Sequence, residues 1–355
     1  MTERELKKLP IPIDYSELIL YLSKAHYSLG KLDSFLRFLP NPRLFIAPLL
    51  VKEATLSSRI DGIKSSIADV YLYEAGQKTA NEDVKEIVNY RKAFEHAQEI
   101  VKRRTITINL IRKIHSLLTD GVRWHDKERG KFREVQTRPV LPKTPVAHMT
   151  SMPPATERVM EYMENLEKYV KHPTQDHLIQ AALIHSQFEC IHPFIAGNGR
   201  VGRMMVPLYL YAKKMISYPA LYISEFFKKN RNNYYTFLNR ASDEDNYEVW
   251  IKFFLDGVCW QCEKTQKIIA DMLALYNKIM DKLSSSKSPY ASALLDFIFY
   301  RPIFTSKDVI KSLNLNKVTA SRLTKMFLRL HVLKESARKR NKVYTFKELF
   351  EVIEQ

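Results

Sequence analysis

The chain has 355 residues, of which 45% are hydrophobic and 27% are charged, and its formal net charge is +17. This composition is typical of a globular protein and excludes an intrinsically disordered chain, while the length allows two or three domains. No apolar stretch reaches the roughly 18 residues that a membrane-spanning helix needs, and the charged start Met1-Thr2-Glu3-Arg4 lacks an apolar signal segment. We therefore expect a cytoplasmic protein that does not enter a membrane.

Most of the chain carries apolar residues at helical spacing, as Leu18, Leu22 and Leu29 illustrate near its start. In the second of the predicted helices, Pro48 falls in the first turn, where proline is tolerated. The helices predicted in this way cover residues 15–38, 47–60, 83–102, 108–118, 155–170, 176–191, 199–214, 231–241 and 247–283.

Residues 132–146 are the exception to this helical pattern. Val135, Gln136 and Thr137 favour extended structure, and the prolines at positions 139, 142 and 145 exclude a helix. The segment therefore predicts a β-hairpin or flap.

A polar linker, residues 284–289, precedes a change of pattern. Three short helices are predicted at 290–300, 306–313 and 317–330, and two strand-like runs follow at 331–335 and 343–346. Residues 301–355 contain 13 Lys and Arg against 5 Asp and Glu, so +8 of the net charge lies in this end of the chain. Excess positive charge indicates an acidic partner or nucleic acid, or else only a solvated basic surface.

Three helices followed by a basic hairpin resemble a winged helix-turn-helix. That resemblance places Thr319, Ser321, Arg322 and Lys325 on or near a recognition helix and makes residues 338–342 the wing. Such modules contact DNA through residues equivalent to 301–346 or serve as protein contacts, and both roles remain open.

The most informative run is His-Pro-Phe-Ile-Ala-Gly-Asn-Gly-Arg-Val-Gly-Arg at residues 192–203. Its Gly-Asn-Gly turn exposes main-chain N–H groups, and a helix that starts there places the positive end of its dipole at the same point. Arg200 and Arg203 add forked donors for phosphate oxygens, and His192 can take a proton beside them. The run indicates phosphoryl or nucleotidyl transfer onto a hydroxyl.

A metal site is the alternative for the preceding residues, because His185, Glu189 and His192 have the spacing of ligands in a helical bundle. A second Glu and His set is missing from the sequence. The alternative also leaves the Gly-Asn-Gly-Arg run without a role.

The run resembles the signature of the Fic family, His-Pro-Phe-x-(Asp/Glu)-Gly-Asn-Gly-Arg-x-x-Arg, and matches eight of its nine fixed positions. The resemblance implies a mostly α fold, with a Fic-type helical core, a small β-hairpin flap and a C-terminal winged helix-turn-helix domain. It also implies a protein adenylyltransferase that moves AMP from ATP to a Ser, Thr or Tyr hydroxyl of a target protein or of itself. In that activity His192 is the base, and the nucleotide is bound by Phe194, Gly197, Asn198, Gly199, Arg200 and Arg203.

The mismatch falls at Ala196, where the family carries the acid that binds Mg²⁺. Magnesium prefers carboxylate and phosphate oxygens, and a methyl group offers none, so we expect no protein metal ligand here. The alanine is consistent with a change made to trap a bound state, with metal held only by phosphates and water or absent, or with a nucleotide binder that has lost its chemistry.

Residues 52–62 resemble the inhibitory helix of N-terminally inhibited Fic proteins, with the pattern Ser/Thr-x-x-x-Glu-Gly. Ser57 and Asp61 take the Ser and Glu positions, and the resemblance implies that Asp61 pairs with Arg203 and blocks the γ-phosphate. An ordinary helix end stopped by Gly62 is the alternative.

The resemblance extends to two further segments and gives a domain division. Glu134, Val135, Gln136 and Thr137 fall where the family flap pairs with the target backbone, and Tyr234 and Tyr235 fall near the adenine, with buried packing as the alternative. The expected divisions are an N-terminal helical region at 1–100, a catalytic core at 101–283 and the winged-helix domain at 284–355.

Other functions are weighed against the transferase. One alternative is a DNA-binding regulator whose Fic-like part only senses nucleotide, and another is an enzyme in which Asp61 positions water to remove AMP from a modified target. A homodimer is a further candidate assembly.

Overall fold

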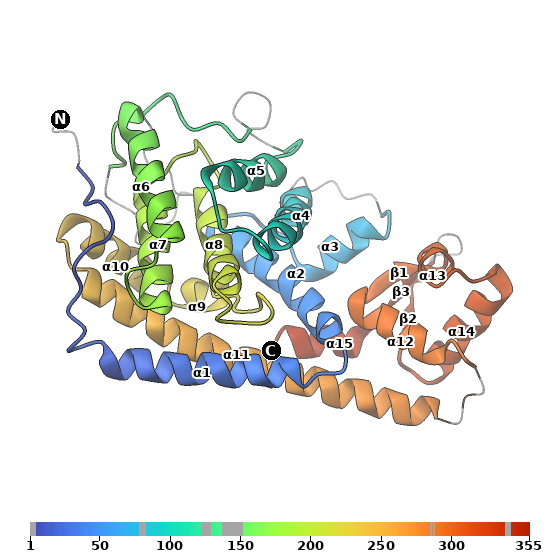
Figure 1. Ribbon diagram of the computed structural model, residues 1–355. Helices are drawn as coiled ribbons and strands as arrows, with labels where there is room; N and C mark the ends of the chain where they lie inside the picture. The colour runs from blue at the N-terminus through green and yellow to red at the C-terminus, as the bar shows by residue number, and fades with distance from the viewer. Residues whose placement is uncertain are drawn as a thin grey trace.

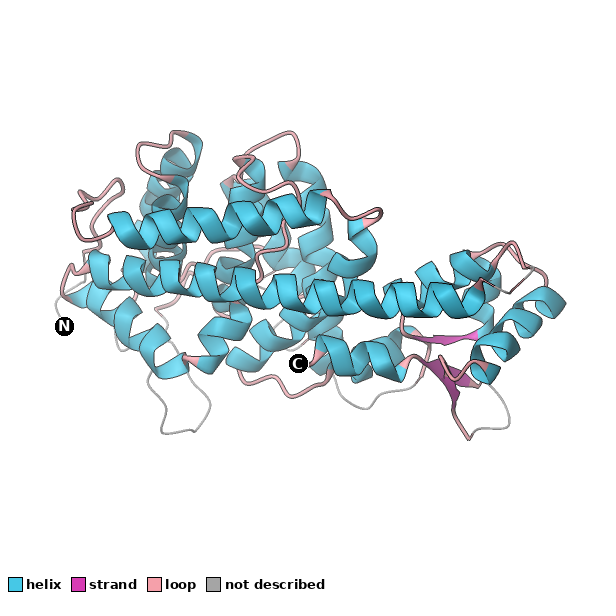
Figure 2. Cartoon of the chain, turned by 90° about the horizontal axis from the view of Figure 1, so that it is seen from below, coloured by secondary structure: helices cyan, strands magenta, loops and turns pink. Residues whose placement is uncertain are grey.

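The computed structural model describes residues 5–77, 83–122, 129–136, 152–284, 286, 288–337 and 342–355. Helices account for most of this described chain, and its strands form one small antiparallel sheet near the C-terminus (Figures 1 and 2). The predicted mostly helical class is therefore confirmed. Among the described residues, no helix combines the length and the apolar character needed to cross a membrane.

The helices before the C-terminal sheet follow the predicted order. The additional α3 and α9, of 8 and 6 residues, are too short to show a helical repeat in the sequence. The elements are α1 (Ile19–Arg37), α2 (Pro42–Ile60), α3 (Ile67–Glu74), α4 (Asp83–Val101), α5 (Ile108–Leu118), η1 (Thr156–Arg158), α6 (Val159–Lys171), α7 (His177–Ile191), α8 (Asn198–Ala212), α9 (Ser224–Lys229), α10 (Arg231–Asp243) and α11 (Tyr247–Leu283).

Helix α2 begins earlier than the sequence pattern predicted. Pro42 starts it, because the fixed φ of proline suits the first helical position and its missing N–H would have had no partner there. Pro48 consequently lies inside the helix rather than in its first turn. It removes one main-chain hydrogen bond, and its ring is buried.

Helix α7 forms the centre of the core. Every residue from Leu178 to Ile191 is buried, as expected for a helix that is covered on all sides. It packs against α6, α8, α10 and α11, and Trp250 of α11 donates its indole N–H to the carbonyl of Ala182 at 2.8 Å. The long helix α11 runs beside α1 along one side of the core and continues to the C-terminal region (Figures 1 and 2).

The C-terminal module, residues 291–355, contains the three predicted helices and both predicted strand-like runs. Its strand order is β1-β3-β2, with Ile303 and Lys334 both paired to Thr345. The short β1 and α15 are additional to the prediction. The elements are α12 (Ala291–Tyr300), β1 (Ile303–Thr305), α13 (Ser306–Ser312), α14 (Lys317–Arg329), β2 (Lys334–Glu335), β3 (Val343–Thr345) and α15 (Lys347–Ile353).

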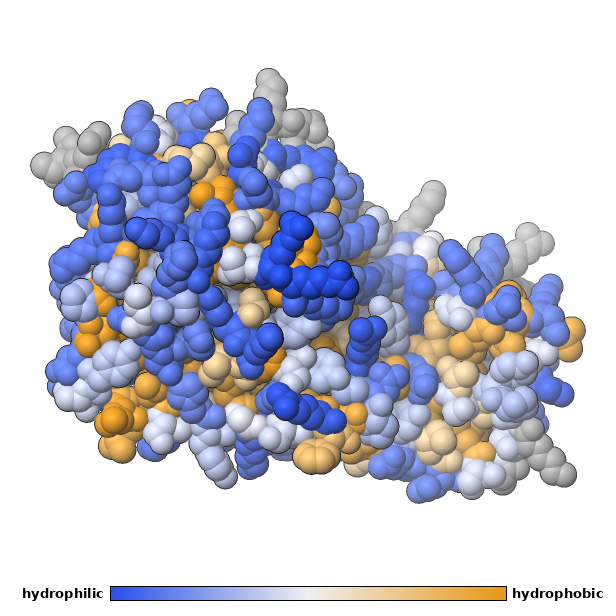
Figure 3. Space-filling model, viewed as in Figure 1, coloured by the Kyte–Doolittle hydropathy of each residue, from blue (hydrophilic) through white to orange (hydrophobic). Residues whose placement is uncertain are grey.

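The C-terminal module docks on α2 and α3 through aromatic side chains. Phe45 of α2 lies 6.1 Å from Phe299 of α12 between ring centres, and Tyr71 of α3 lies 6.0 Å from Phe350 of α15. Arg301 also donates a hydrogen bond to the carbonyl of Glu74. On the face seen in Figure 3, apolar side chains are conspicuous over this module, while hydrophilic side chains cover most of the helical core.

The described part of the predicted flap, residues 132–136, contains no strand. The main-chain N–H of Arg133 donates to the carbonyl of Pro193 at 2.8 Å, so this segment is bonded to a loop and not to a neighbouring strand. Thr137 and the rest of the flap lie outside the described residues.

Candidate active site

The candidate base His192 lies where α7 ends. Its backbone is left-handed, with φ 47° and ψ 59°, and its N–H donates to the carbonyl of Phe188 at 3.1 Å. Pro193 follows and has no N–H with which to continue the helix. Burial and the nearby Arg133 lower the pKa of the His192 ring to about 4, so the imidazole is neutral at pH 7.

The loop after His192 leads directly into α8. Gly197 is the N-cap with φ 79°, and a side chain there would be strained and would lie 3.3 Å from Leu118. The first main-chain bond of α8 runs from Val201 to Gly197, at 3.1 Å. The N–H groups of residues 198–200 therefore precede the helical ladder, and helix ends of this kind favour the binding of anions.

Asn198 supports this loop with its side chain. Its amide nitrogen donates to the carbonyl of Phe194 at 2.7 Å, and its amide oxygen accepts from the Phe194 N–H at 2.9 Å. Both residues are buried. Because both ends of its side-chain amide are bonded to Phe194, Asn198 can contact a nucleotide only through its main-chain N–H. The ring of Phe194 is fully buried.

His115 of α5 is a supporting residue that the sequence analysis missed. Its ring stacks on Phe194 with centres 3.8 Å apart. Nδ1 accepts from the N–H of Gly130 at 3.0 Å, so Nε2 carries the proton and donates to the carbonyl of Ala196 at 3.0 Å. Burial lowers the pKa of His115 to about 4, which keeps this neutral form. A histidine on the buried face of an amphipathic helix gives no separate sequence signal.

Arg203 is held by the end of α2, as predicted. Its Nε donates to the Ser57 hydroxyl at 2.8 Å, and its Nη2 donates to the Ser57 carbonyl at 2.9 Å and to Asp61 at 2.8 Å. Only 1% of the Arg203 side chain is exposed. Gly199 lies against this pair, because a Cβ there would come within 2.7 Å of Arg203 and 3.1 Å of Asp61.

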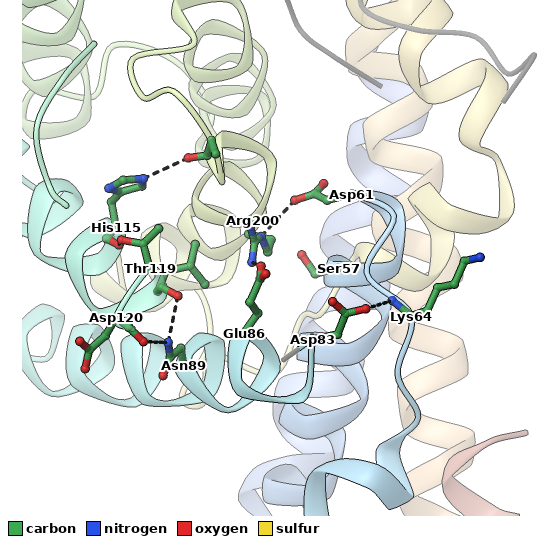
Figure 4. A network of polar contacts seen from close by, with 12 residues as sticks. Ser57, Asp61, Lys64, Asp83, Glu86, Asn89, His115, Thr119, Asp120 and Arg200 are labelled. Atoms are coloured by element: carbon green, nitrogen blue, oxygen red, sulfur yellow. Dashed lines mark hydrogen bonds and ion pairs between the residues drawn. The ribbon is translucent and has the colours of Figure 1, made fainter. Parts of the chain in front are cut away.

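Asp61 also engages Arg200, which the sequence analysis did not predict. The Nε of Arg200 donates to Asp61 at 3.1 Å, and its Nη1 donates to Glu86 of α4 at 2.6 Å. Figure 4 shows Arg200 between these two carboxylates. One carboxylate at the end of α2 thus holds both arginines of α8, and we call Asp61, Arg200 and Arg203 the clamp.

Arg133 fastens the start of the predicted flap to the same loop. Its Nε donates to the carbonyl of His192 at 2.9 Å, and its Nη1 donates to the side chain of Gln136 at 2.9 Å. Gln136 in turn donates to the carbonyl of Pro153 at 2.8 Å. Glu134 and Val135 are exposed.

Tyr234 and Tyr235 are neighbouring buried residues of α10. Tyr234 is buried, stacks on Phe227 with ring centres 4.4 Å apart, and shares a hydrogen bond of 2.9 Å with Nε2 of His185. Its ring therefore occupies the core. Tyr235 is 8% exposed, and burial and Asp61 raise its pKa to about 12.

The alternative metal site finds no support among the residues that the structure describes. They contain no group of three or more His, Cys, Asp and Glu side chains arranged to hold a metal ion. His185 is engaged by Tyr234. Burial raises the pKa of Glu189 to about 7, and the nearby Arg203 opposes this increase.

Two family models match consecutive parts of this chain. Residues 19–99 match the N-terminal region of the Fic/DOC family, and residues 105–210 match the Fic/DOC family domain. Together these matches cover more than half of the chain, which therefore belongs to the Fic/DOC family.

Curated relatives carry the name protein adenylyltransferase Fic. One from Drosophila yakuba is 26% identical over 213 residues, which cover 54% of this chain and 40% of the relative. One from Nematostella vectensis is 29% identical over 165 residues, which cover 45% of this chain and 35% of the relative. The chain thus spans less than half the length of these relatives.

Solved structures share the fold. A Fic family protein from Desulfovibrio desulfuricans aligns with a TM-score of 0.61 at 18% identity, over 96% of this chain and 98% of its own. Fic-1 from C. elegans aligns with a TM-score of 0.56 at 18% identity, over 73% of this chain and 75% of the aligned chain. The first alignment includes most of the C-terminal module.

Proposed function

We propose that this chain is a protein adenylyltransferase, which transfers AMP from ATP to a Ser, Thr or Tyr hydroxyl of a target protein or of itself. The observation that carries the proposal is a neutral His192 at the end of α7, six residues before the start of α8, the helix that bears Arg200 and Arg203. The names of the curated relatives support the same activity.

In this reaction the target hydroxyl oxygen attacks the α-phosphorus of ATP and forms a new P–O bond. The bond between the α-phosphorus and the bridging oxygen breaks, and pyrophosphate leaves with the electron pair. His192 accepts the hydroxyl proton, which its low pKa permits at neutral pH because the ring is unprotonated. The new negative charge on the phosphate oxygens is stabilised by the main-chain N–H groups of residues 198–200 and by arginine.

The residues of the loop do not fit a protein-bound Mg²⁺. The side chain at position 196 is a methyl group, and the Ala196 carbonyl already accepts a hydrogen bond from His115. Magnesium prefers oxygen ligands and near-octahedral geometry. No step of the mechanism is therefore assigned to a metal held by this loop, and Arg203 and Arg200 are the groups that counter the phosphate charge.

The clamp supports autoinhibition as part of this proposal. Arg203 can bind a terminal phosphate only after Asp61 releases it, since Asp61 occupies its Nη2 at 2.8 Å. Asp61 likewise holds Arg200 at 3.1 Å, so the same carboxylate competes with ATP at two arginines. A seated α2 therefore holds the enzyme in an inactive arrangement.

The test is transfer from labelled ATP by the double variant Ala196→Asp, Asp61→Gly. This variant restores the family acid and opens the clamp, and label is expected on the chain itself or on a protein of a cell extract. Adding His192→Ala is expected to abolish the label, whereas adding His96→Ala, an exposed histidine of α4, leaves it unchanged. Absence of both label and ATP binding would show that the proposal is wrong.

A nucleotide-sensing DNA-binding regulator is a second candidate, and the C-terminal module favours it. Ser321, Arg322 and Lys325 of α14 are exposed on the helix that would read DNA, and Asn316 caps that helix through the Thr319 N–H at 2.8 Å. Lys342 pairs with Glu335 at 2.9 Å, and the rest of the expected wing lies outside the described residues.

DNA binding that weakens with salt, and that Arg322→Ala with Lys325→Ala reduces, would support this second candidate. Unchanged binding would exclude α14 as the contact. The homodimer and the cytoplasmic location remain predictions.

A further inference from the structure

A second cavity lies on the side of α2 that faces away from the clamp. Its volume is about 680 Å³, and its walls come from α2, α9, α11 and the residues that follow α15. Lys52 and Arg59 line it, seven residues apart on one face of the helix, whereas Ser57 and Asp61 lie on another face. The cavity is therefore separate from the candidate active site.

Positive charge dominates this cavity. Five cations line it, against the two acids Glu225 and Glu354. The cations are Lys52, Arg59, Lys228, Lys229 and Lys264.

Two of the cations already have partners in the cavity wall. Lys52 is buried and lies 2.9 Å from Glu225, and Lys264 donates to the main-chain oxygen of Gln355 at 2.5 Å. These contacts join α2 to α9, and α11 to the end of the chain. The three other cations, Arg59, Lys228 and Lys229, are exposed, and we call them the rim cations.

The rim cations are crowded and poorly compensated. Arg59 is fixed by hydrogen bonds from Nε and Nη2 to the carbonyl of Ser65, at 3.0 and 2.8 Å. Burial and the charge of Arg59 lower the pKa of Lys228, and the nearby Glu225 opposes this decrease. Among the described residues, neither Lys228 nor Lys229 forms an ion pair with an acid. Such a group of cations is stabilised by an anion between them.

An aromatic wall completes the cavity. Trp260 of α11 lines it and is half-buried, and the ammonium group of Lys229 lies 5.1 Å from the centre of its ring. An indole face beside several cations can stack on a planar ring while the cations hold attached anionic groups.

We propose that this cavity binds a small anion with two or more phosphate groups, either a free polyphosphate or the phosphates of a nucleotide. The bound anion bridges Arg59 of α2 to Lys228 and Lys229 of α9. It thereby holds α2 against the core from the side opposite the clamp. The proposal does not depend on the transferase activity, because none of these residues belongs to the clamp or to the loop after His192.

The experiment is calorimetric titration of the full chain with sodium tripolyphosphate, ATP and ADP. The variant Lys228→Ala, Lys229→Ala removes two exposed cations and is expected to weaken tripolyphosphate binding at this site about tenfold or more, as the loss of two charge-assisted contacts implies. The matched control Lys267→Ala, Lys282→Ala removes two exposed lysines of α11 outside the cavity and is expected to leave the affinity unchanged.

A local readout separates this cavity from the active site. Tripolyphosphate is expected to change the tryptophan fluorescence of the native chain, and the variant Trp260→Phe is expected to lose that change. If Trp260→Leu weakens ATP but not tripolyphosphate, the ligand is a nucleotide, and if it weakens neither, the ligand is a free polyphosphate.

Equal tripolyphosphate affinity in the Lys228→Ala, Lys229→Ala variant and the native chain would overturn the proposal. Binding of duplex DNA but not of tripolyphosphate that depends on Lys228 and Lys229 would overturn it as well. In either case the site assigned to the cavity does not exist, whatever the outcome of the transferase assay.

Discussion

Replacing Asp61 with alanine is expected to release both arginines of the clamp from their shared carboxylate, although Arg200 keeps Glu86 and Arg203 keeps Ser57 as partners. Asp61 accepts hydrogen bonds from Arg200 at 3.1 Å and from Arg203 at 2.8 Å. A hydrogen bond between charged groups contributes about 1.5–3 kcal/mol, so two contribute about 3–6 kcal/mol in a dry site. The Asp61 side chain is 23% exposed, and screening by water reduces this to about 2 kcal/mol.

An opening cost of about 2 kcal/mol corresponds to a factor of about 30 in an equilibrium constant. The Asp61→Ala variant is therefore expected to bind ATP about 30-fold more tightly in calorimetry. In the Ala196→Asp background it is also expected to transfer label faster at subsaturating ATP. Without ligand the same variant should melt at a lower temperature, because Arg203 then remains buried without a carboxylate partner.

Asp69→Ala is the matched control for this experiment. Asp69 belongs to the capping box of α3 and bonds to Ser66, so its loss weakens a helix without touching either arginine. That variant should melt earlier but keep the native ATP affinity. Unchanged ATP affinity in Asp61→Ala, or an equal gain in Asp69→Ala, would refute competition between Asp61 and the phosphates.

Three other predictions address the base, the loop and a buried carboxyl. Because the base must be neutral and the pKa of His192 is lowered to about 4, transfer is expected to stay level from pH 6 to 8 and to fall only as the pH approaches that pKa; an acid limb near pH 6.5 in the pH–rate profile would contradict it. His115→Phe keeps a ring beside Phe194 but leaves the Ala196 carbonyl and the Gly130 N–H without partners. Urea denaturation should therefore show that the free energy of unfolding falls by about 2–4 kcal/mol. An unchanged midpoint would show that the two His115 hydrogen bonds do not stabilise the loop. Burial raises the pKa of Glu53 to about 7 from 4.5, so its contribution to stability is complete below pH 4.5 and is lost as the pH rises through 7. Glu53→Gln should therefore remove a loss of unfolding free energy on the order of 2 kcal/mol between pH 5 and 8. Identical profiles of unfolding free energy against pH for the variant and the native chain would contradict this prediction.

The long helices and the contact between Asp61 and Arg203 could be predicted from the sequence, because each is marked by a pattern within one short segment. Helix α5 has the predicted ends at Ile108 and Leu118, since Thr107 caps it and apolar residues repeat along it. The resemblance of residues 52–62 to a Fic inhibitory helix identified Ser57 and Asp61, and both contact Arg203 as that resemblance implied.

The remaining parts of the site depend on contacts between residues far apart in the chain. Glu86 reaches Arg200 from a helix more than one hundred positions earlier, and nothing in its own sequence neighbourhood marks it. Arg133 and His115 likewise bond to main-chain carbonyls of a loop that only the fold brings near them. Carbonyl groups carry no residue identity, so these contacts leave no trace in the sequence pattern.

Helix α2 has a mechanical consequence that follows from its two ends. It is a 19-residue rod, about 28 Å long at 1.5 Å per residue. Phe45 near its start contacts Phe299 of the C-terminal module. Asp61 at its end accepts hydrogen bonds from Arg200 and Arg203. A tilt of about 4° at the module displaces the far end by about 2 Å, which is enough to break a hydrogen bond. The helix is thus a lever between the basic C-terminal module and the loop after His192, and Pro48 inside it is the place where a proline bends a helix.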